Sequence, residues 1–495
     1  MHRHPSPVSA VTEAALTVVG AGPAGLAAAI QAARLGLDVT VVDEQLLIGG
    51  QVYRQPPESF TVPAPAASRE SGKARALFAQ VEQHRARLGF RLDALVWGAA
   101  HTEGQPGATL SFTSAGRCGT LRTETLILAT GATERVYPFP GWTLPGVYTA
   151  GAVQILLKSQ FVLPGSRIVV AGTGPLLLVL AEQLHRAGAQ VVAILELAAV
   201  AAGWRRLHKW RGNLGLLAEG LGLHWRRVRA GIPFRQRMTI LEARSGAARG
   251  DNPTAGGGTS QVREIVIGPV DAAWRPLAGR RETLAVDAVA VSHGFVSNSE
   301  LALLLGCEHR YDEERGGWVP LADERQETTV PGVFTAGDCA GVAGSAVAQV
   351  EGALAALGAG LRLKRLGEPE HRALAAPLLA ELRRLTRFRE FLDPLSRFRP
   401  GLLEVCTPET LVCRCEGVTR AEIERAVACG YTHQLSLKLK TRTGMGLCQG
   451  RMCRPALAQL MARALGCSPA ETGLYHPRAP VRPVPLKVLA GEERP

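Results

Sequence analysis

Four cysteines near the carboxyl end of the chain have a spacing that suits a metal centre. Cys413 and Cys415 form a C-x-C pair, and Cys448 and Cys453 form a C-x4-C pair after a gap of 32 residues. Thiolates bind both zinc and iron–sulfur clusters, although zinc sites more often use C-x2-C pairs at both ends. The spacing therefore predicts that these cysteines are metal ligands. An iron–sulfur cluster, zinc and an unoccupied set are the alternatives that it leaves open.

Two predicted helices would position these cysteines. The first spans residues 419–429, with Thr419 as its N-cap and Gly430 as its stop, and the second runs from near Cys453 to Leu465. The other six cysteines lack a paired spacing, so we expect ordinary thiols there and no disulfide framework.

A glycine-rich turn near the amino end has the spacing of a dinucleotide site. A predicted strand at residues 16–19 enters Gly-Ala-Gly-Pro-Ala-Gly, a small-residue helix follows over residues 26–35, and a second strand at residues 38–42 ends in two acids. The glycines permit a tight turn, close approach to a pyrophosphate and close packing of helix on strand, while the acid accepts ribose hydroxyls. A turn without a ligand is the alternative. The predicted contacts are Gly20, Gly22, Pro23, Ala24, Gly25, Asp43 and Glu44, with Asp43 best placed for the ribose.

The residues that follow these acids extend the predicted site. Gln45, Gly50 and Gln51 come next, and the adjacent glycines Gly49 and Gly50 let the chain pass close to a bound dinucleotide. A plain turn is the alternative for this glycine pair.

A second glycine turn, in the middle of the chain, has a defect. After a predicted strand at residues 167–171, Gly172 and Gly174 fill the first two glycine positions, but Leu177 fills the third. A bulky residue there should push helix and strand apart and alter the pyrophosphate site. Glu196 ends the next predicted strand, and an acid there repels a 2′-phosphate, so NAD or ATP is expected rather than NADP. An empty second site is the alternative.

Two later motifs resemble those of a flavoprotein family. A predicted strand at residues 121–128 enters Ala-Thr-Gly at residues 129–131, and residues 330–339 contain Gly-Asp followed by cysteine. Two such motifs with a nucleotide domain between them resemble the two-dinucleotide-binding-domain flavoproteins of the glutathione-reductase-like fold. The expected fold class is α/β, with two Rossmann-like nucleotide-binding domains followed by a small helical four-cysteine iron–sulfur domain.

This resemblance implies where FAD binds. The first glycine turn would hold it, with Thr130 and Gly131 where the chain crosses between the nucleotide domains. Gly337 and Asp338 would close over the ribityl chain and pyrophosphate. A helix from Ser345 to about residue 361 would aim its N-terminus at the flavin ring.

The cysteine module is similar to the small helical 2Fe–2S domain of bacterioferritin-associated ferredoxin. The second pair is C-x2-C in that domain and C-x4-C here, a wider form found in a subset of flavoprotein subunits. The resemblance implies a 2Fe–2S cluster on all four cysteines, and zinc remains the alternative.

Composition excludes several classes of protein. The 495 residues contain no run of 18 apolar residues, so no membrane span is expected, and the polar amino end argues for a cytoplasmic protein without a signal peptide. The net charge of +13 invites a nucleic-acid partner, but only 7 of the 56 basic residues are lysine and the arginines form no single stripe. We therefore expect no nucleic-acid binding.

The chain is expected to divide into five parts. Residues 14–150 and 285–365 form the FAD domain, and residues 151–284 form the second nucleotide domain. Residues 366–405 form a helical connector, residues 406–470 the 2Fe–2S domain, and residues 471–495 a Pro-rich tail. Two surface loops are expected at residues 56–68 and 245–260, and residues 203–215 form a basic segment with two tryptophans.

Nearly the whole chain resembles the alpha subunits of heteromeric bacterial amine dehydrogenases, the group of D-hydroxyproline dehydrogenase, opine oxidase and hydrogen cyanide synthase. The stretch from Thr441 to Cys453 carries most of the resemblance. It implies an FAD-dependent oxidoreductase subunit that receives electrons from an FAD-containing beta subunit, which oxidises the amine. A small gamma subunit, an FMN at a subunit interface, and NAD or ATP in the second nucleotide site are optional additions within this group.

Two other functions remain as alternatives. Disulfide reduction is not expected, because no cysteine occurs between Met1 and Arg117 or between Gly119 and Gly306, where a redox pair would lie. A free-standing NAD(P)H-dependent FAD and iron–sulfur reductase is one alternative, and a non-catalytic scaffold is the other. No acid–base dyad can be assigned from the sequence, so the catalytic residues stay unassigned.

Overall fold

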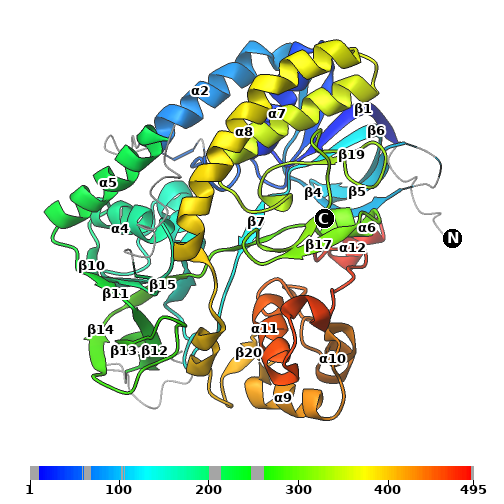
Figure 1. Cartoon of the computed structure of the whole chain (residues 1–495). Coiled ribbons are helices and arrows are strands. Elements are labelled where there is room, and N and C mark those ends of the chain that lie inside the picture. Colours follow the sequence, from blue (N-terminus) through cyan, green and yellow to red (C-terminus); the bar gives the residue numbers. More distant parts are fainter. Residues whose placement is uncertain are drawn as a thin grey trace. The chain divides into compact units, whose positions relative to one another are not determined.

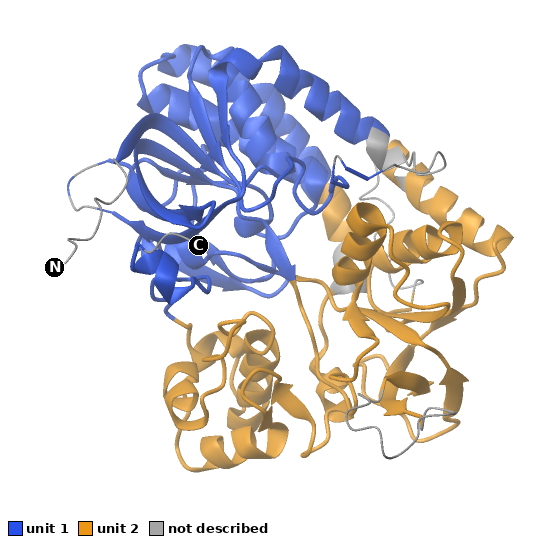
Figure 2. Ribbon diagram, turned by 180° about the vertical axis from the view of Figure 1, so that it is seen from behind, with its two compact units in different colours: residues 1–133, 296–386, 476–495 blue, residues 134–295, 387–475 orange. Residues whose placement is uncertain are grey.

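The structure is a computed structural model of the chain, and it describes residues 11–57, 59–60, 69–101, 104, 106–199, 213–246 and 261–491. The predicted loops at 56–68 and 245–260 and the basic segment at 203–215 lie mostly outside the described residues. Two compact units are present, one of residues 1–133, 296–386 and 476–495, the other of residues 134–295 and 387–475 (Figure 2). Within the described part, no helix has the length and apolar character that crossing a bilayer requires.

The first unit is built on a mostly parallel sheet of order β3-β2-β1-β6-β5-β4, with β19 paired to β6 (Figure 1). The parallel register sets Val19 beside Val42 and Leu128, so three strands end at one edge. The segments that follow these strands therefore share the carboxyl edge of the sheet, where ligands bind in such folds. The strands are β1 (Thr12–Val19), β2 (Val39–Val42), β3 (Leu88–Arg91), β4 (Ala94–Ala100), β5 (Ala108–Ser114), β6 (Arg117–Leu128) and β19 (Val333–Thr335).

Small side chains allow two helices to pack closely beside this sheet. A Cβ added to Gly352 of α7 (Ser345–Arg362) would lie 2.1 Å from the carbonyl oxygen of Ala24 in α1 (Pro23–Arg34), so this crossing requires glycine. Both helices bury alanine-rich faces in one core with the strands. The unit also contains α2 (Arg69–Gln83), η2 (Arg85–Arg87), α6 (Glu300–Leu304), η5 (Gly337–Cys339), α12 (Leu486–Leu489), β17 (His309–Asp312), β18 (Gly317–Pro320) and the first part of α8 (Glu368–Ser396).

A second parallel sheet, of order β11-β10-β9-β15-β8, organises the other unit. On one face its residues Val170 and Ala290 pack with Leu180 of α4 (Leu176–Arg186), and on the other face Val169 and Val289 pack with the antiparallel sheet β12-β13-β14. The remaining elements are β8 (Val147–Thr149), α3 (Ala150–Ile155), η3 (Leu156–Gln160), β9 (Arg167–Gly172), β10 (Gln190–Glu196), α5 (Leu214–Arg229), β11 (Phe234–Gln236), β12 (Met238–Ser245), β13 (Val262–Pro269), β14 (Glu282–Ala285) and β15 (Ala288–Ser292). Strands β7 (Ala132–Glu134) and β16 (Phe295–Ser297) form a separate pair.

The cysteine module occupies the end of the second unit and is small and helical. Thr419 caps its first helix with a full capping box, because the hydroxyl accepts from the Glu422 amide while the Glu422 carboxylate accepts from the Thr419 amide. That helix ends before Gly430, as the sequence predicted, but α10 was not foreseen. Its elements are η6 (Pro400–Val405), β20 (Leu411–Cys413), β21 (Val418–Thr419), α9 (Arg420–Ala428), α10 (Gln434–Thr441), α11 (Arg454–Leu465) and η7 (Pro469–Thr472).

Candidate functional site

The first glycine turn is held in a shape that only glycine permits at two positions. Gly20 has a φ of +109°, and a Cβ there would lie 2.2 Å from the Ala129 carbonyl oxygen. A Cβ on Gly25 would lie 1.8 Å from the Gly20 carbonyl oxygen. The turn thus folds tightly onto the end of β6, and α1 starts directly after Gly22 with its free amides at the carboxyl edge of the sheet.

Asp43 faces this turn, whereas Glu44 does not. The Asp43 carboxylate accepts hydrogen bonds from the backbone N–H of Ala21 at 2.5 Å and of Gln45 at 2.7 Å. Burial raises the pKa of Asp43, although the two amides oppose that rise. Glu44 is exposed to solvent. Of the two acids, Asp43 is therefore the one that contacts the glycine turn.

The glycine pair after these acids returns to the turn. Gly50 has a φ of +60°, and a Cβ there would lie 2.8 Å from the Gly22 Cα. Gln51, by contrast, is exposed. The close approach of Gly50 to Gly22 leaves no room for a side chain where the two segments meet. A bare backbone at this position suits a site where a dinucleotide binds close to the chain.

The Ala-Thr-Gly segment and the Gly-Asp motif meet the same edge of the sheet. Thr130 donates its hydroxyl hydrogen to the carbonyl oxygen of Asn298 at 2.7 Å, and the Asn298 side chain donates back to the Thr130 carbonyl oxygen at 3.1 Å. Gly131 has a φ of +68°. A Cβ on Gly337 would lie 2.7 Å from the Ala24 Cβ, so motifs more than 300 residues apart in sequence are in contact here.

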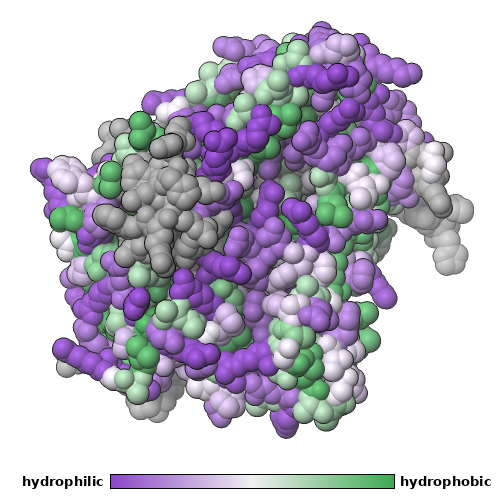
Figure 3. Space-filling view, viewed as in Figure 1, coloured by the Kyte–Doolittle hydropathy of each residue, from purple (hydrophilic) through white to green (hydrophobic). Residues whose placement is uncertain are grey.

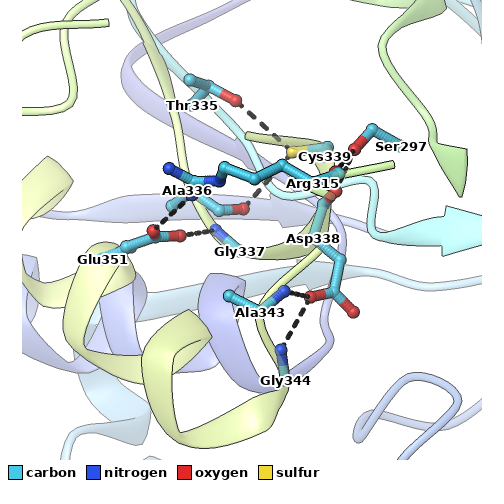
Figure 4. Close-up of polar contacts among 10 residues, drawn as sticks. All are labelled: Ser297, Arg315, Thr335, Ala336, Gly337, Asp338, Cys339, Ala343, Gly344 and Glu351. Atoms are coloured by element: carbon cyan, nitrogen blue, oxygen red, sulfur yellow. Dashed lines mark hydrogen bonds and ion pairs between the residues drawn. The ribbon is translucent and has the colours of Figure 1, made fainter. Parts of the chain in front are cut away.

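Figure 4 shows how the Gly-Asp motif is supported. One carboxylate oxygen of Asp338 accepts from the amides of Ala343 at 3.0 Å and Gly344 at 3.2 Å, which fixes the loop that leads into α7. The Gly337 amide donates to the Glu351 carboxylate at 2.9 Å, and that carboxylate pairs with Arg315 at 3.4 Å. The Glu351 carboxylate thus holds the Gly337 amide, and the Asp338 carboxylate holds the loop before α7.

Sequence reasoning missed the role of Glu351. This residue is 4% exposed, and burial raises its pKa to about 7, while Arg315 acts in the opposite direction. The sequence did contain a signal for this role. Glu351 is the only charged residue from Ser345 to Leu361, in a helix whose other side chains are mostly small or apolar. A lone carboxyl in such a stripe is expected to have a buried partner.

The second turn repeats the first with differences. Glu196 sits beside Gly172 in the strand register and accepts from the amides of Gly174 at 3.1 Å and Ala198 at 2.9 Å. Burial raises the pKa of Glu196 to about 7, although these amides and the Thr173 hydroxyl oppose the rise.

The shape of this second turn departs from the first near the defect. Gly174 has a φ of +96°, whereas its counterpart Gly22 has a φ of −78°. Helix α4 starts at Leu176, one position later than α1 starts in the first turn, and Leu177 is fully buried in the core. A leucine in the third glycine position therefore accompanies a turn of different shape.

The four cysteines lie near enough to shift one another's pKa values. Cys413, at the end of β20, receives a hydrogen bond from the Cys453 thiol, which lowers the pKa of Cys413 to about 6 and raises that of Cys453. The Cys448 amide donates to Cys415, an interaction that lowers the Cys415 pKa, but burial and the neighbouring sulfurs outweigh it and the net shift is upward. The cysteines interact across the pairs as well, since Cys413 acts on Cys415 and Cys448 acts on Cys453.

One contact brings the two cysteine loops together. A Cβ on Gly446 would lie 2.3 Å from the Cys415 Cβ, so the loops that carry Cys415 and Cys448 close on each other at a glycine. Among the described residues, no group of three or more His, Cys, Asp or Glu side chains has the arrangement of a metal site. Thiolates on loops are the usual ligands of a 2Fe–2S cluster.

The chain belongs to the pyridine nucleotide-disulphide oxidoreductase family, which matches residues 14–207 and 260–358. Residues 411–463 match the BFD-like [2Fe-2S] binding domain. The protein is thus an FAD-dependent oxidoreductase whose cofactors are FAD and a 2Fe–2S cluster. The predicted fold class is confirmed.

Individual relatives narrow the resemblance. The chain is 36% identical to an opine oxidase subunit of Agrobacterium tumefaciens, over 96% of this chain and 91% of that protein. It is 33% identical to the hydrogen cyanide synthase subunit HcnB of Pseudomonas aeruginosa, over 95% of this chain and 97% of that protein. Among solved structures, L-proline dehydrogenase from P. horikoshii has the same fold, with a TM-score of 0.65, 17% identity, and coverage of 97% of this chain and 80% of that one. The predicted resemblance to the opine oxidase and hydrogen cyanide synthase group is confirmed.

Proposed function

We propose that this chain is the electron-transfer flavoprotein subunit of a heteromeric amine dehydrogenase or oxidase. A separate FAD-containing subunit oxidises a D-hydroxyproline, opine or amino-acid substrate to an imine, and this chain relays the electrons through its 2Fe–2S cluster and FAD. A flavin exchanges electrons singly or in pairs and a 2Fe–2S cluster exchanges them singly, so the two together suit relay rather than substrate chemistry.

The observation that carries this proposal is the presence of two redox modules in one chain. A turn built for a flavin dinucleotide, with Gly20, Gly25 and Gly337 in positions that exclude side chains, accompanies a module over residues 411–463 that matches the BFD-like [2Fe-2S] binding domain. The names of the two relatives, each a subunit of an oxidase or synthase, support a partner subunit. A gamma subunit and an interfacial FMN remain optional parts of this proposal.

The same proposal assigns the cofactor residues. The first turn, with Asp43, would hold FAD together with the loop at 45–51, Thr130, Gly131, Gly337 and Asp338. The turn at Gly172 and Gly174, with Glu196, would hold NAD or ATP. The predicted division into FAD domain, second nucleotide domain, connector, 2Fe–2S domain and tail stays a proposal. The two compact units follow other boundaries, since one of them joins residues 134–295 with residues 387–475.

The test is to express the chain with and without the products of the genes beside its own. Imine formation from D-hydroxyproline, octopine or glycine should require the partner flavoprotein. Imine formation by this chain alone would refute the division of labour.

A free-standing NAD(P)H-dependent reductase is the second candidate, and one observation favours it. Glu196 lies level with Gly172 at the carboxyl edge of β9 and β10, where a nucleotide ribose would bind. The positive φ of Gly174 and the buried Leu177 count against a productive pyrophosphate site. Bleaching of the flavin by NADH in the isolated chain would favour this candidate.

A further inference from the structure

Helix α5 of the second nucleotide domain carries an apolar stripe on its outer side. Its members are Leu214, Ala218, Leu221, Trp225 and Val228, whose spacings alternate between four and three residues. Side chains at that spacing share one face of a helix. Figure 3 shows hydrophobic atoms along the course of α5, next to hydrophilic ones.

These side chains are exposed to a degree that is unusual for such a stripe. Leu214 is 73% exposed, Leu221 62%, Trp225 61% and Val228 56%. A surface helix normally turns such a stripe toward the core and its charges toward water. A contiguous apolar surface of this kind marks an interaction site on a protein that is otherwise well packed.

The opposite face of the same helix carries the arginines that hold it to the domain. Arg226 forms an ion pair with Glu182 of α4. Arg227 donates to the carbonyl oxygen of Ile232 at 2.7 Å, and its guanidinium lies 5.4 Å from the centre of the Phe234 ring. Arg226 and Arg227 thus hold the inner face of α5 to the domain, beside the half-buried Leu216 and Leu223. Among the described residues, the stripe on the outer face stays exposed.

The charges beside the stripe select the occupant. Arg229 lies over the Trp225 ring at 5.5 Å and borders the stripe with a positive charge. The only acid of α5 is Glu219, which falls on the inner face by helical periodicity. A second copy of α5 would bring Arg229 toward another Arg229 in a parallel pairing, or toward the acid-free Leu214 end in an antiparallel one. The border therefore fits a different protein that carries carboxylates beside an apolar ridge.

We propose that the α5 stripe docks the FAD-containing partner subunit through an apolar ridge flanked by carboxylates. This inference rests on the proposed function, which supplies the partner. The helix is about 24 Å long at 1.5 Å per residue, so the stripe is the energetic centre of an interface rather than all of it. Trp225 is the expected anchor, because buried tryptophans dominate binding energy at such centres.

The test compares variants in the complex of the full-length chain with its co-expressed flavoprotein subunit. The double variant Leu221→Glu, Trp225→Glu should raise the dissociation constant roughly 30-fold or more. Leu486→Glu is the matched control, because Leu486 is 83% exposed in α12 of the other compact unit, and this variant should bind like wild type. Thermal unfolding and cofactor absorbance check that each variant is folded.

Two further measurements use the border charge and the unaltered protein. Arg229→Glu should weaken binding and reduce its dependence on salt, since it removes the charge that attracts the carboxylates. Hydrogen–deuterium exchange in α5 of the wild-type chain should slow when the partner binds, which needs no substitution at all.

Each outcome decides between the claims. If the wild-type chain binds the flavoprotein subunit and the folded stripe variant binds equally well, or if exchange in α5 is unchanged, the docking inference is wrong and the proposed function stands. If the wild-type chain binds no flavoprotein subunit, both fail. If the isolated wild-type chain is a dimer that the stripe variant converts to a monomer, the occupant is a second copy and the inference is overturned.

Discussion

Substituting Gly25 by alanine should remove FAD while leaving the iron–sulfur module intact. The new Cβ would lie 1.8 Å from the Gly20 carbonyl oxygen, whereas ordinary van der Waals contact begins at 3.4 Å, so helix and turn must separate by about 1.6 Å. Because the obstacle is a backbone carbonyl, no side-chain rotation relieves it. Overpacking of a core costs roughly 1–3 kcal/mol, and we expect the upper end here. For a unit of this size that loss lowers the melting temperature by roughly 6–12 °C.

The assay measures flavin absorbance, iron content and the melting temperature of the same purified sample. Iron should stay at the wild-type level, because the cysteines belong to the other compact unit. Gly72→Ala in α2 is the matched control, since its Cβ would meet no atom within 4 Å and its φ is ordinary, and a helical Gly→Ala change is stabilising by about 1 kcal/mol or less. A Gly25→Ala protein with full flavin content and wild-type melting temperature would refute the reasoning about this turn.

Three further predictions concern the cluster and the second nucleotide turn. Cys453→Ser should lose cluster iron and visible absorbance, whereas Cys429→Ser should keep both, because Cys429 is exposed at the end of α9; equal iron in the two variants would contradict the ligand assignment. Gly446→Ala should lower cluster occupancy in reconstitution, because its Cβ would lie 2.3 Å from the Cys415 Cβ; unchanged occupancy would show that the loops can part. Burial raises the pKa of Glu196 from 4.5 to about 7 in the folded state, so protonation of Glu196 stabilises the fold fully below pH 4.5, and this stabilisation is lost as the pH rises to 7. Because glutamine does not titrate, the melting temperature of Glu196→Gln should rise relative to that of wild type as the pH increases from 4.5 to 7. Parallel pH profiles of the two melting temperatures would contradict the raised pKa of Glu196.

The turns could be predicted because each depends on a few adjacent residues. A strand followed by Gly20, Gly22 and Gly25 constrains the local backbone almost completely, and the acid that must face it lies at the end of the next parallel strand. The N-cap at Thr419 could be predicted as well, since its hydrogen bonds lie within four residues. Local geometry of this kind can be predicted because it depends only on residues that are close in sequence.

Features that depend on distant contacts could not be predicted. The bond from the Gly337 amide to Glu351 requires that α7 cross a loop fourteen positions earlier in sequence, and the direction of a single carboxylate is set by that packing. Helix α10 has no strong capping signal, because its N-cap is His433. The two faces of α5 were hidden for the same reason, since only the fold shows that Arg226 meets Glu182 and that Leu214 and Leu221 are exposed.

The most direct test of the relay is anaerobic reduction of this chain's cofactors by the amine. We would mix the purified chain with substrate amine, with and without the partner flavoprotein, and follow the flavin absorbance together with the electron paramagnetic resonance signal of the reduced cluster. The account predicts that both centres are reduced only when the partner is present. Reduction of the flavin and cluster by the amine in the chain alone, or no reduction of either when the partner turns over, would contradict it.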